Sequence, residues 1–348
     1  MFKILVVAPS WIGDTLLAQP LFSLLHTRHR ALALDVLAPA WTLPLVARMP
    51  EVRRGIPSPF SHGELRLGAR RQLAQELSGA GYDQAIVLPN SLKSALVPFL
   101  AGIPRRTGYR GEMRWGLLND MRKLDERATP LLAERYAALA TANQPPAGPL
   151  PMVRLAVDDG ARIATLDRLK LDTVRTAVVL CPGAEYGPAK RWPAPYYAEL
   201  GRELASRGCS VWVVGSANDA ALGEEIVRSA GEDCINLCGR TTLDEAIDVV
   251  ASARVVVSND SGLMHVAAAV GRPLVALYGS SSPAFTPPLA PDADILKLDL
   301  PCSPCFKREC PLHHFNCMMH LTPARVLAAP HFARMRWSKR TVVSSVQP

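Results

Sequence analysis

Short runs of Val, Ile and Leu alternate with helical patterns along the whole chain, and this alternation constrains the fold more than any other feature. Apolar runs that lack a period of two are typical of strands buried on both faces, as in parallel sheets. We expect strands at 3–8, 32–38, 84–88, 176–181, 211–215, 255–258 and 273–278. We expect helices at 15–29, 67–80, 196–207 and 243–252. This order predicts an α/β protein with doubly wound parallel sheets.

The length of the chain predicts two domains. Its 348 residues exceed what one hydrophobic core usually supports. The stretch 143–175 opens with Asn-Gln-Pro-Pro-Ala-Gly-Pro and then becomes charged and helical, which is typical of an interdomain linker. We therefore predict domains at 1–155 and 156–330 and a tail at 331–348 that could cross back to the N-terminal domain. Two sheets that face each other create a cleft at the carboxyl ends of their strands, where ligands bind in such folds.

The net charge of the chain and the absence of several known binding motifs limit the partners that we expect. A formal net charge of +8 favours phosphate-bearing ligands. The sequence has no RNP, KH or zinc-finger pattern, so we expect no nucleic acid partner. It also lacks a Gly-x-Gly-x-x-Gly after a strand and a Walker loop, which argues against a dehydrogenase and an NTPase. No uncharged apolar stretch reaches the roughly 18 residues of a membrane span, and we expect a cytoplasmic protein.

The loop after the first expected strand carries a carboxylate, Asp14, at the start of a helix. One interpretation is an N-cap that satisfies free amide donors. The other is a general base that accepts a proton from an attacking hydroxyl, a role worth on the order of 100-fold to 10,000-fold in rate. Ser10 and Trp11 precede it in the same loop.

Three loops of the second half are candidates for binding a diphosphate. Lys190 and Arg191 lie in a loop held open by Pro and Gly, where they suit the charge of a leaving diphosphate. The turn from Asn259 to Met264 feeds a helix whose first amides form an anion site, and Asp260 there suits sugar hydroxyls better than phosphate. Ser216 either contacts a nucleoside or belongs to an ordinary capped turn. His265 is expected to be a structural hydrogen-bonding residue.

Basic residues also gather in the first half, after the strand that ends near 88. Asn90 and Lys93 lie in one loop, and Lys93 together with the segment 105–115 makes five cations interleaved with aromatic residues. Such a pattern suits single-stranded RNA or phosphorylated sugars. Arg110 and Arg114 belong to this segment.

Taken together, the segments 9–14, 88–99, 110–120, 181–193 and 259–269 resemble the ADP-heptose:lipopolysaccharide heptosyltransferases, glycosyltransferase family 9. The resemblance implies a GT-B fold of two Rossmann-like domains and an inverting transfer of L-glycero-D-manno-heptose from ADP-heptose to the first heptose of the lipopolysaccharide inner core. The acceptor, Kdo2-lipid A-heptose, implies peripheral contact with the inner face of the cytoplasmic membrane. No catalytic metal is implied.

The same resemblance implies roles for individual residues. Asp14 is implied to be the general base. Lys190 is implied to bind the donor phosphates. The remaining implied donor-site residues are Arg191, Ser216, Asp260, Ser261, Gly262, Leu263 and Met264, and the implied acceptor contacts are Ser10, Trp11, Asn90, Lys93, Arg110 and Arg114.

Two other functions remain open at this stage. A GT-B-like sugar-nucleotide epimerase would convert ADP-heptose without an acceptor. A binding protein for anionic saccharides would tolerate Asp14→Asn without loss of activity.

The segment near the C-terminus is rich in thiols. Cys302, Cys305, Cys310 and Cys317 could supply a structural zinc site or iron–sulfur ligands, although the spacing matches no common zinc module. The alternative is a set of reduced thiols packed in an irregular loop.

Overall fold

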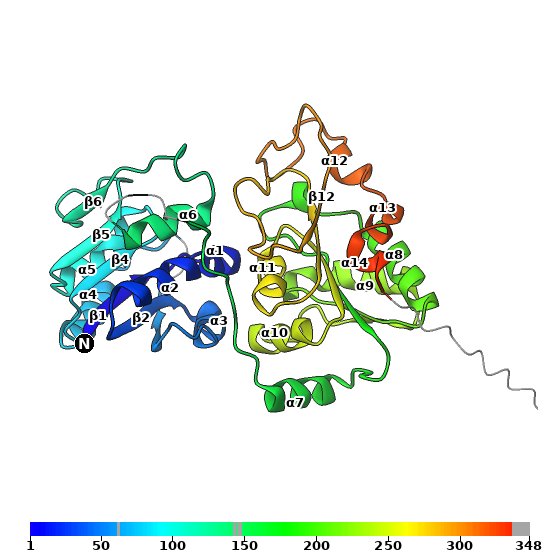
Figure 1. Cartoon of the computed structure of the whole chain (residues 1–348), viewed down its shortest axis with the longest axis horizontal. Coiled ribbons are helices and arrows are strands. Elements are labelled where there is room, and N and C mark those ends of the chain that lie inside the picture. Colours follow the sequence, from blue (N-terminus) through cyan, green and yellow to red (C-terminus); the bar gives the residue numbers. More distant parts are fainter. Residues whose placement is uncertain (61–62, 142–143, 145–147, 336–348) are drawn as a thin grey trace, which may run out of the picture. The chain divides into compact units, whose positions relative to one another are not determined.

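The computed structural model describes residues 1–60, 63–141, 144 and 148–335. The chain divides into two compact units. Unit 1 comprises Met1–Ala156 and the short segment Ala284–Leu289, and unit 2 comprises Val157–Pro283 and the chain from Ala290 onward. Each unit contains one parallel sheet with helices on both of its faces (Figure 1). The predicted α/β class with two Rossmann-like sheets is confirmed.

Unit 1 is built on a six-stranded sheet in the order β3-β2-β1-β4-β5-β6. Its strands are β1 Phe2–Val7, β2 Leu32–Pro39, β3 Arg54–Ser58, β4 Gln84–Val87, β5 Arg105–Tyr109 and β6 Asp120–Arg122. Its helices are α1 Ile12–Leu17, α2 Gln19–Arg28, α3 Leu43–Ala47, α4 Leu67–Ser78, α5 Leu96–Leu100 and α6 Leu132–Ala137. The central strand β1 pairs with β2 and β4, and its apolar residues from Ile4 onward are buried.

Unit 2 repeats this plan with the order β12-β11-β10-β7-β8-β9. Its strands are β7 Ala177–Cys181, β8 Ser210–Val213, β9 Cys234–Asn236, β10 Val255–Asn259, β11 Leu274–Tyr278 and β12 Asp294–Lys297. Its helices are α7 Asp159–Leu169, α8 Ala194–Ser206, α9 Ala220–Ala230, α10 Leu243–Ala251, α11 Gly262–Ala269, α12 Asn316–Met319, α13 Pro323–Leu327 and α14 Pro330–Ala333. Strands β7, β8, β10 and β11 are buried along their whole length.

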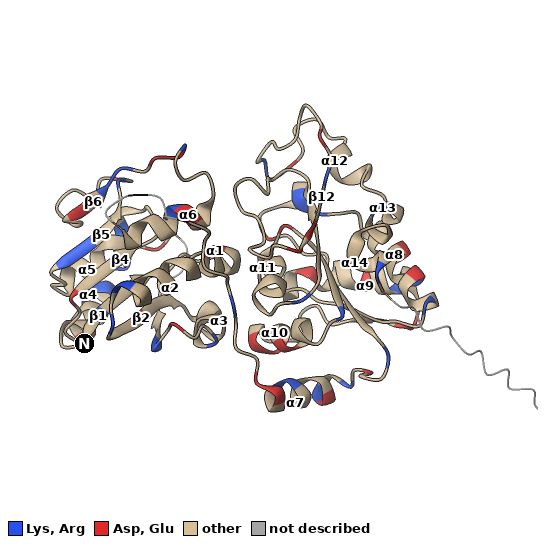
Figure 2. Ribbon diagram, viewed as in Figure 1, with Lys and Arg blue, Asp and Glu red and all other residues tan. Residues whose placement is uncertain are grey.

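The structure differs from the sequence-based expectation at short, polar elements. The helix expected at 15–29 is two helices, because α1 ends at Leu17 and α2 begins at Gln19, just before Pro20. The stretch 143–175 is not all linker, since α7 belongs to unit 2. The basic segment that begins at Arg105 starts as strand β5, the blue strand beside that label in Figure 2.

A short segment from the second half of the sequence, Ala284–Leu289, belongs to unit 1. The Phe285 carbonyl accepts a hydrogen bond from the Leu132 amide at 2.9 Å, and its ring lies 4.9 Å from the Arg135 guanidinium. The expected tail behaves differently, because Phe332 of α14 is fully buried in the core of unit 2. The rest of that tail, from 336, lies outside the described residues.

The helices among the described residues are short. None of the helices there combines the length and the apolar character that a membrane crossing requires.

Candidate functional site

The candidate residues of unit 1 follow three neighbouring strands. β1 pairs in parallel with β4, and β4 pairs in parallel with β5, so their carboxyl ends meet at one edge of the sheet. Ser10, Trp11 and Asp14 follow β1, Asn90 and Lys93 follow β4, and Arg110 and Arg114 follow β5. The structure therefore brings these loops together at one edge, as parallel topology requires.

Asp14 is the third residue of α1 and is partly exposed. The N-cap is Trp11, whose side chain makes no capping hydrogen bond, so the N-cap interpretation of Asp14 is wrong. The loop before the helix is held by Thr15, whose hydroxyl donates to the Trp11 carbonyl at 2.9 Å. Burial, with a smaller contribution from the Asp14 charge, raises the pKa of Tyr136 well above its usual value. Asp14 thus lies in the first turn of α1, where its charge acts on the buried phenol of Tyr136 in α6.

Arg114 is not an acceptor contact in this structure, because its side chain is fully buried. Its guanidinium donates to the Pro89 carbonyl at 2.7 Å, to Asn90 Oδ1 at 3.1 Å and to the Tyr109 carbonyl. Burial lowers its pKa, and the nearby Glu112 charge partly offsets that effect. Arg114 is therefore a positioning residue that ties the loop after β5 to the loop after β4.

The other basic candidates of unit 1 remain accessible. Arg110 is exposed, and its guanidinium lies 5.6 Å from the centre of the Trp115 ring. Lys93 is partly exposed, and its carbonyl accepts a hydrogen bond from Arg70 at 2.9 Å. Trp11 exposes 52% of its surface, and the Ser10 carbonyl accepts from Trp41 Nε1 at 3.2 Å. These side chains present cations and aromatic faces to solvent, which suits a phosphorylated sugar.

In unit 2 the loops after β7 and β10 are joined by an ion pair. Lys190 Nζ lies 2.6 Å from Asp260 Oδ2, and both side chains are largely buried, with 19% and 5% exposed. Lys190 Nζ also lies 5.4 Å from the centre of the Tyr186 ring. Because β7 and β10 are adjacent and parallel, their following loops are neighbours. The lysine is held in place before any ligand binds.

Asn259, the last residue of β10, fixes the loop that carries Lys190. Its Oδ1 accepts hydrogen bonds from the Trp192 amide at 3.1 Å and from the Tyr197 hydroxyl at 3.0 Å. Its Nδ2 donates to the Pro182 carbonyl at 2.7 Å. Sequence reasoning missed this role, although the position of an amide directly before Asp260 was visible in the sequence.

The residues at the start of α11 divide into accessible and buried ones. Ser261 is the N-cap, makes no side-chain cap, and its Oγ lies 3.2 Å from Ser258 Oγ. Ser261, Gly262 and Leu263 are partly exposed, so their amides are available to an anion. Met264 is fully buried, so its side chain is not accessible to a ligand.

His265, one residue further along α11, is also buried. Burial lowers its pKa to about 4; the Asp260 charge opposes this effect and the Lys190 charge adds to it. A neutral imidazole fits the structural role expected for it.

The loop after β8 forms a capped turn. Asp219 Oδ2 accepts from the Ser216 amide at 3.0 Å and from its hydroxyl at 2.8 Å, so the capped-turn interpretation of Ser216 is confirmed. Arg191 Nη2 lies 3.8 Å from Asp219 Oδ1, and the buried Nε of Arg191 has no partner among the described residues. A Cβ at Gly183 would lie 2.5 Å from Asp219 Oδ2, so only glycine fits there. Asp219, which sequence reasoning left as part of a turn, links the loops after β7 and β8.

Ser281 is a further residue that sequence reasoning missed. It follows β11, is buried, and its hydroxyl has no hydrogen-bond partner among the described residues. Buried hydroxyls are nearly always paired, so this group is a candidate ligand contact at the same sheet edge.

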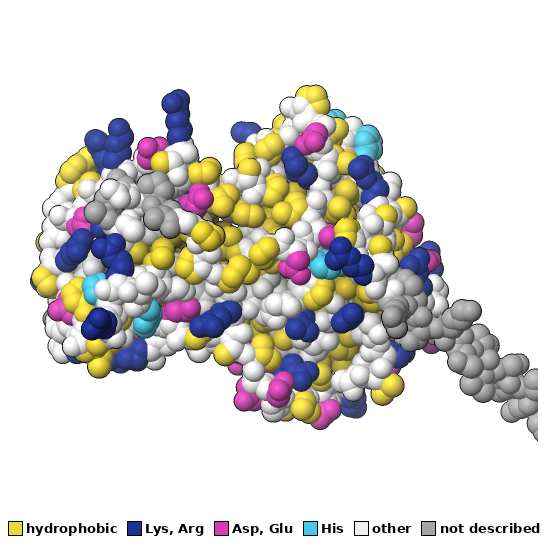
Figure 3. All heavy atoms as spheres, in the orientation of Figure 1, with side chains coloured by type: hydrophobic (Ala, Val, Ile, Leu, Met, Phe, Trp, Pro, Cys, Tyr) yellow, Lys and Arg dark blue, Asp and Glu magenta, His cyan; other side chains and the backbone are white. Residues whose placement is uncertain are grey.

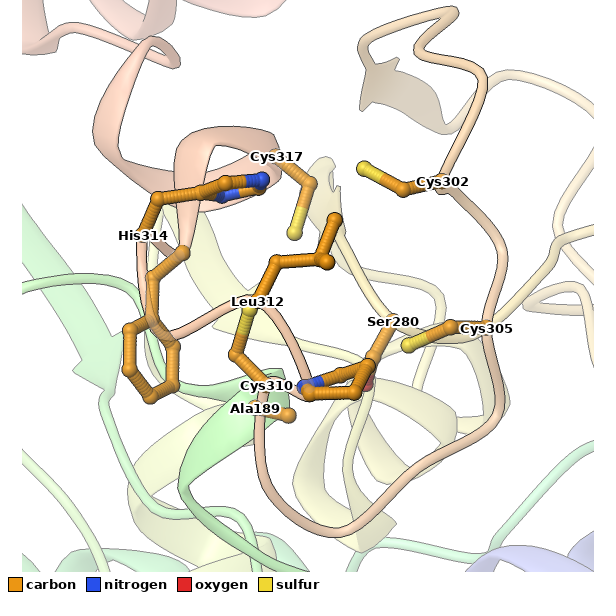
Figure 4. A pocket seen from close by; sticks show the side chains of 10 residues that line it. Ala189, Ser280, Cys302, Cys305, Cys310, Leu312, His314 and Cys317 are labelled. Carbon is orange, nitrogen blue, oxygen red and sulfur yellow. The ribbon is translucent and has the colours of Figure 1, made fainter.

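The thiol-rich segment lines a small cavity of about 20 Å³. Ala189, from the loop that carries Lys190, lines the same cavity. Cys302, Cys305, Cys310 and Cys317 surround this cavity together with Leu312 and His314 (Figure 4). Within the described residues, no group of three or more His, Cys, Asp or Glu side chains is placed to hold a metal ion. The described side chains therefore offer no zinc or iron–sulfur site. Cys302, Cys305 and Cys310 are free thiols in irregular chain, and Cys317 is a free thiol of α12.

This segment instead braces the loop that carries Lys190. The Ala189 amide donates to the Arg308 carbonyl at 3.0 Å, and the Tyr186 hydroxyl donates to the Phe306 carbonyl at 3.0 Å. A Cβ at Gly187 would lie 2.5 Å from the Arg308 carbonyl oxygen, so the two loops approach as closely as glycine allows.

Two Rossmann-like units, one with a basic, aromatic loop edge and one with a lysine beside an open helix N-terminus, define the class of nucleotide-sugar glycosyltransferases with the GT-B fold. The family model for glycosyltransferase family 9 (heptosyltransferase) matches residues 70–316. The chain belongs to this family.

Two curated relatives and one solved structure are similar to nearly the whole chain. Lipopolysaccharide heptosyltransferase 2 of Escherichia coli K12 is 48% identical over 93% of this chain and 96% of its own length. Lipooligosaccharide heptosyltransferase 2 of Haemophilus influenzae is 46% identical over 85% and 88%. The solved structure of E. coli ADP-heptose lps heptosyltransferase II has a TM-score of 0.85 and 46% identity, with 94% of this chain and 97% of that chain covered.

Proposed function

We propose that the chain transfers L-glycero-D-manno-heptose from ADP-heptose to the first heptose of the lipopolysaccharide inner core. The observation that carries this proposal is the buried Lys190–Asp260 pair beside the start of α11, in a chain nearly half identical to lipopolysaccharide heptosyltransferase 2. The pair offers one cation for a diphosphate and one carboxylate for sugar hydroxyls at the same sheet edge. The proposal needs neither a nucleic acid partner nor a metal.

In the proposed reaction the donor binds unit 2. Lys190 neutralises the diphosphate, and the amides of Ser261, Gly262 and Leu263 donate to its oxygens. When Lys190 binds the diphosphate instead of Asp260, the Asp260 carboxylate accepts hydrogen bonds from heptose hydroxyls. Arg191, whose buried Nε is unpaired, is the second cation available to the diphosphate.

The acceptor binds unit 1 in this proposal. Arg110 and Lys93 bind its anionic groups, and Ser10, Trp11 and Asn90 contact the sugar. Asp14 removes the proton from the acceptor hydroxyl while its oxygen attacks the anomeric carbon. The bond from that carbon to the diphosphate oxygen breaks on the opposite face, so the configuration inverts and ADP leaves.

The acceptor also sets the location that we propose. Kdo2-lipid A-heptose is embedded in a bilayer by its acyl chains, so the enzyme meets it at the cytoplasmic face of the inner membrane. Exposed Trp11, Trp41 and Trp115, all in unit 1, suit a membrane interface.

The test measures ADP release from ADP-heptose with two acceptors. Release with Kdo2-lipid A-heptose and not with Kdo2-lipid A supports the proposed acceptor. Release with Kdo2-lipid A alone moves the acceptor one sugar inward and overturns it. Conversion of ADP-heptose without any acceptor indicates an epimerase, and binding of the acceptor without any turnover indicates a binding protein.

A further inference from the structure

A second pocket of unit 2 lies at the edge of the sheet opposite the donor loops. It has a volume of about 340 Å³, within the range of ligand pockets. Its basic lining residues are Arg162 of α7 and Arg175, Arg254 and Arg272, which precede strands β7, β10 and β11. Because these strands are parallel, their first residues meet at one edge, and the loops after β7 and β10 leave from the other. We call this site the arginine pocket.

Two of its arginines are neutralised within the protein. Arg162 Nη2 lies 2.9 Å from Asp159, and its Nη1 donates to Ser252 at 3.4 Å. Arg175 binds Asp172 and Asp233, which outweigh the effect of burial and raise its pKa. Basic and acidic side chains accordingly lie side by side around α7 in Figure 3. Arg162 and Arg175 therefore line the pocket, but their charges are already balanced by these carboxylates.

The other two arginines have no counterion. Within the described part of the chain, no hydrogen bond or ion pair engages the guanidinium of Arg254 or Arg272, and the Nε of Arg272 is buried without a partner. Their backbones are fixed, because the Arg254 amide donates to the Ala177 carbonyl at 2.8 Å and the Arg272 amide to the Ala267 carbonyl at 2.9 Å. The Nε of Arg272 is a buried donor without an acceptor among the described residues, and buried donors are nearly always paired. Arg254 is exposed and presents its charge to the same pocket.

The missing acceptor is best matched by a phosphate. A guanidinium fork fits phosphate oxygens with two parallel hydrogen bonds, and a phosphate dianion balances two such cations. Thr173 and Thr176, which also line the pocket, add hydroxyl donors. A carboxylate carries a single charge and would leave one arginine unbalanced.

We propose that the arginine pocket binds a phosphate ester at a site separate from that of the sugar nucleotide. The phosphate belongs either to a soluble metabolite or to a lipid headgroup, since both present the same group. The site goes beyond the proposed transfer reaction, because it lies at the edge of the unit 2 sheet away from Lys190 and Asp260.

The experiment uses the full chain saturated with ADP, so that the donor site is filled. Calorimetry with inorganic pyrophosphate tests the soluble source, and sedimentation with phosphatidylcholine vesicles with and without phosphatidate tests the lipid source. The variant Arg254→Gln/Arg272→Gln is compared with Arg228→Gln/Arg325→Gln, which removes the same charge from exposed sites of unit 2.

We expect the first variant to bind at least about 10-fold more weakly in one of the two arms, and the control to bind like the unmodified protein. Lysine at positions 254 and 272 should also weaken binding, since it keeps the charge and loses the fork. Absence of binding in both arms, or equal binding by the two double variants, would overturn the proposal.

Discussion

Lys190 and Asp260 lie 2.6 Å apart at the ends of two neighbouring loops of unit 2, and only 5% of the Asp260 side chain is exposed. The carboxylate therefore holds the lysine in position but also competes with any diphosphate for it. A ligand that binds Lys190 must also supply hydrogen-bond donors to the Asp260 carboxylate, since a buried unpaired charge is costly. The hydroxyls of a sugar bonded to the diphosphate supply such donors next to the lysine, and ADP alone lacks that sugar.

The first prediction concerns this lysine. Lys190→Ala should weaken ADP binding at least about 10-fold, because a charge-assisted contact to the diphosphate is lost. Calorimetry measures the change, and Lys297→Ala is the control, since Lys297 pairs with Asp299 on the surface at 2.8 Å. Unchanged ADP affinity in Lys190→Ala would remove the lysine from the donor site.

Asp14 gives the second prediction. Asp14→Asn should keep the fold and lower turnover by at least about 100-fold, because the amide cannot accept a proton. The single-turnover rate and the dissociation constant for ADP are measured together, and the latter should not change. Near-normal turnover would show that another group removes the proton.

The third prediction separates two arginines that look alike in the sequence. Arg110→Ala should raise the KM for the lipid acceptor without altering ADP affinity, and the rise should shrink at high salt, because Arg110 is exposed. Arg114→Ala should instead lower the melting temperature, since it leaves the Pro89 and Tyr109 carbonyls without their buried donor. A melting temperature unchanged by Arg114→Ala contradicts the positioning role.

Arg110 and Arg114 also show what the sequence could and could not predict about the site. The sequence grouped Arg110 and Arg114 in one basic segment, although it did not predict β5, the strand that both residues follow. It could not show that only Arg114 turns inward, since that depends on acceptors supplied by Pro89 and Asn90 from another loop. The sequence likewise could not show that the Met264 side chain is buried, because the face of α11 that is buried depends on its packing.

The elements of the fold also divide into those that the sequence predicted and those that it did not. Buried runs rich in valine, such as the predicted strand 255–258 within β10, were recognised as strands, because burial on both faces leaves a continuous apolar pattern. The edge strand Asp294–Lys297 alternates between partial and full exposure and carries charged ends, so it resembled a loop. The segment Ala284–Leu289 gave no sequence signal, since its place in unit 1 rests on tertiary contacts.

His265 gives the fourth prediction, on pH. Its pKa is about 4 in the folded protein, below the usual 6.5, chiefly because of burial. The unfolded chain therefore binds a proton at higher pH than the folded one, and stability from the neutral imidazole is present above pH 6.5 and falls as the pH drops toward 4. Urea unfolding at several pH values should show a shallower decline for His265→Gln than for the unmodified protein. Equal slopes would mean that His265 is not buried in the neutral form.

The last prediction concerns the eight free thiols. Burial alone would raise the pKa of Cys310, but hydrogen bonds from the backbone amides of residues 312–315 outweigh it and lower the pKa. Burial raises the pKa of Cys238 to about 12, and that of Cys181 further still.

Because the thiolate is the nucleophile, Cys310 should react first with iodoacetamide and at a lower pH than an ordinary cysteine, while Cys181 and Cys238 should react only after unfolding. Mass spectrometry of partially labelled native protein identifies the modified site, and Cys310→Ser should remove the fastest phase. Prior labelling of Cys317, whose pKa is raised by burial and by the neighbouring thiols, would contradict this order. Labelling at Cys310 should also weaken ADP binding, because the segment around Arg308 braces the loop that carries Lys190.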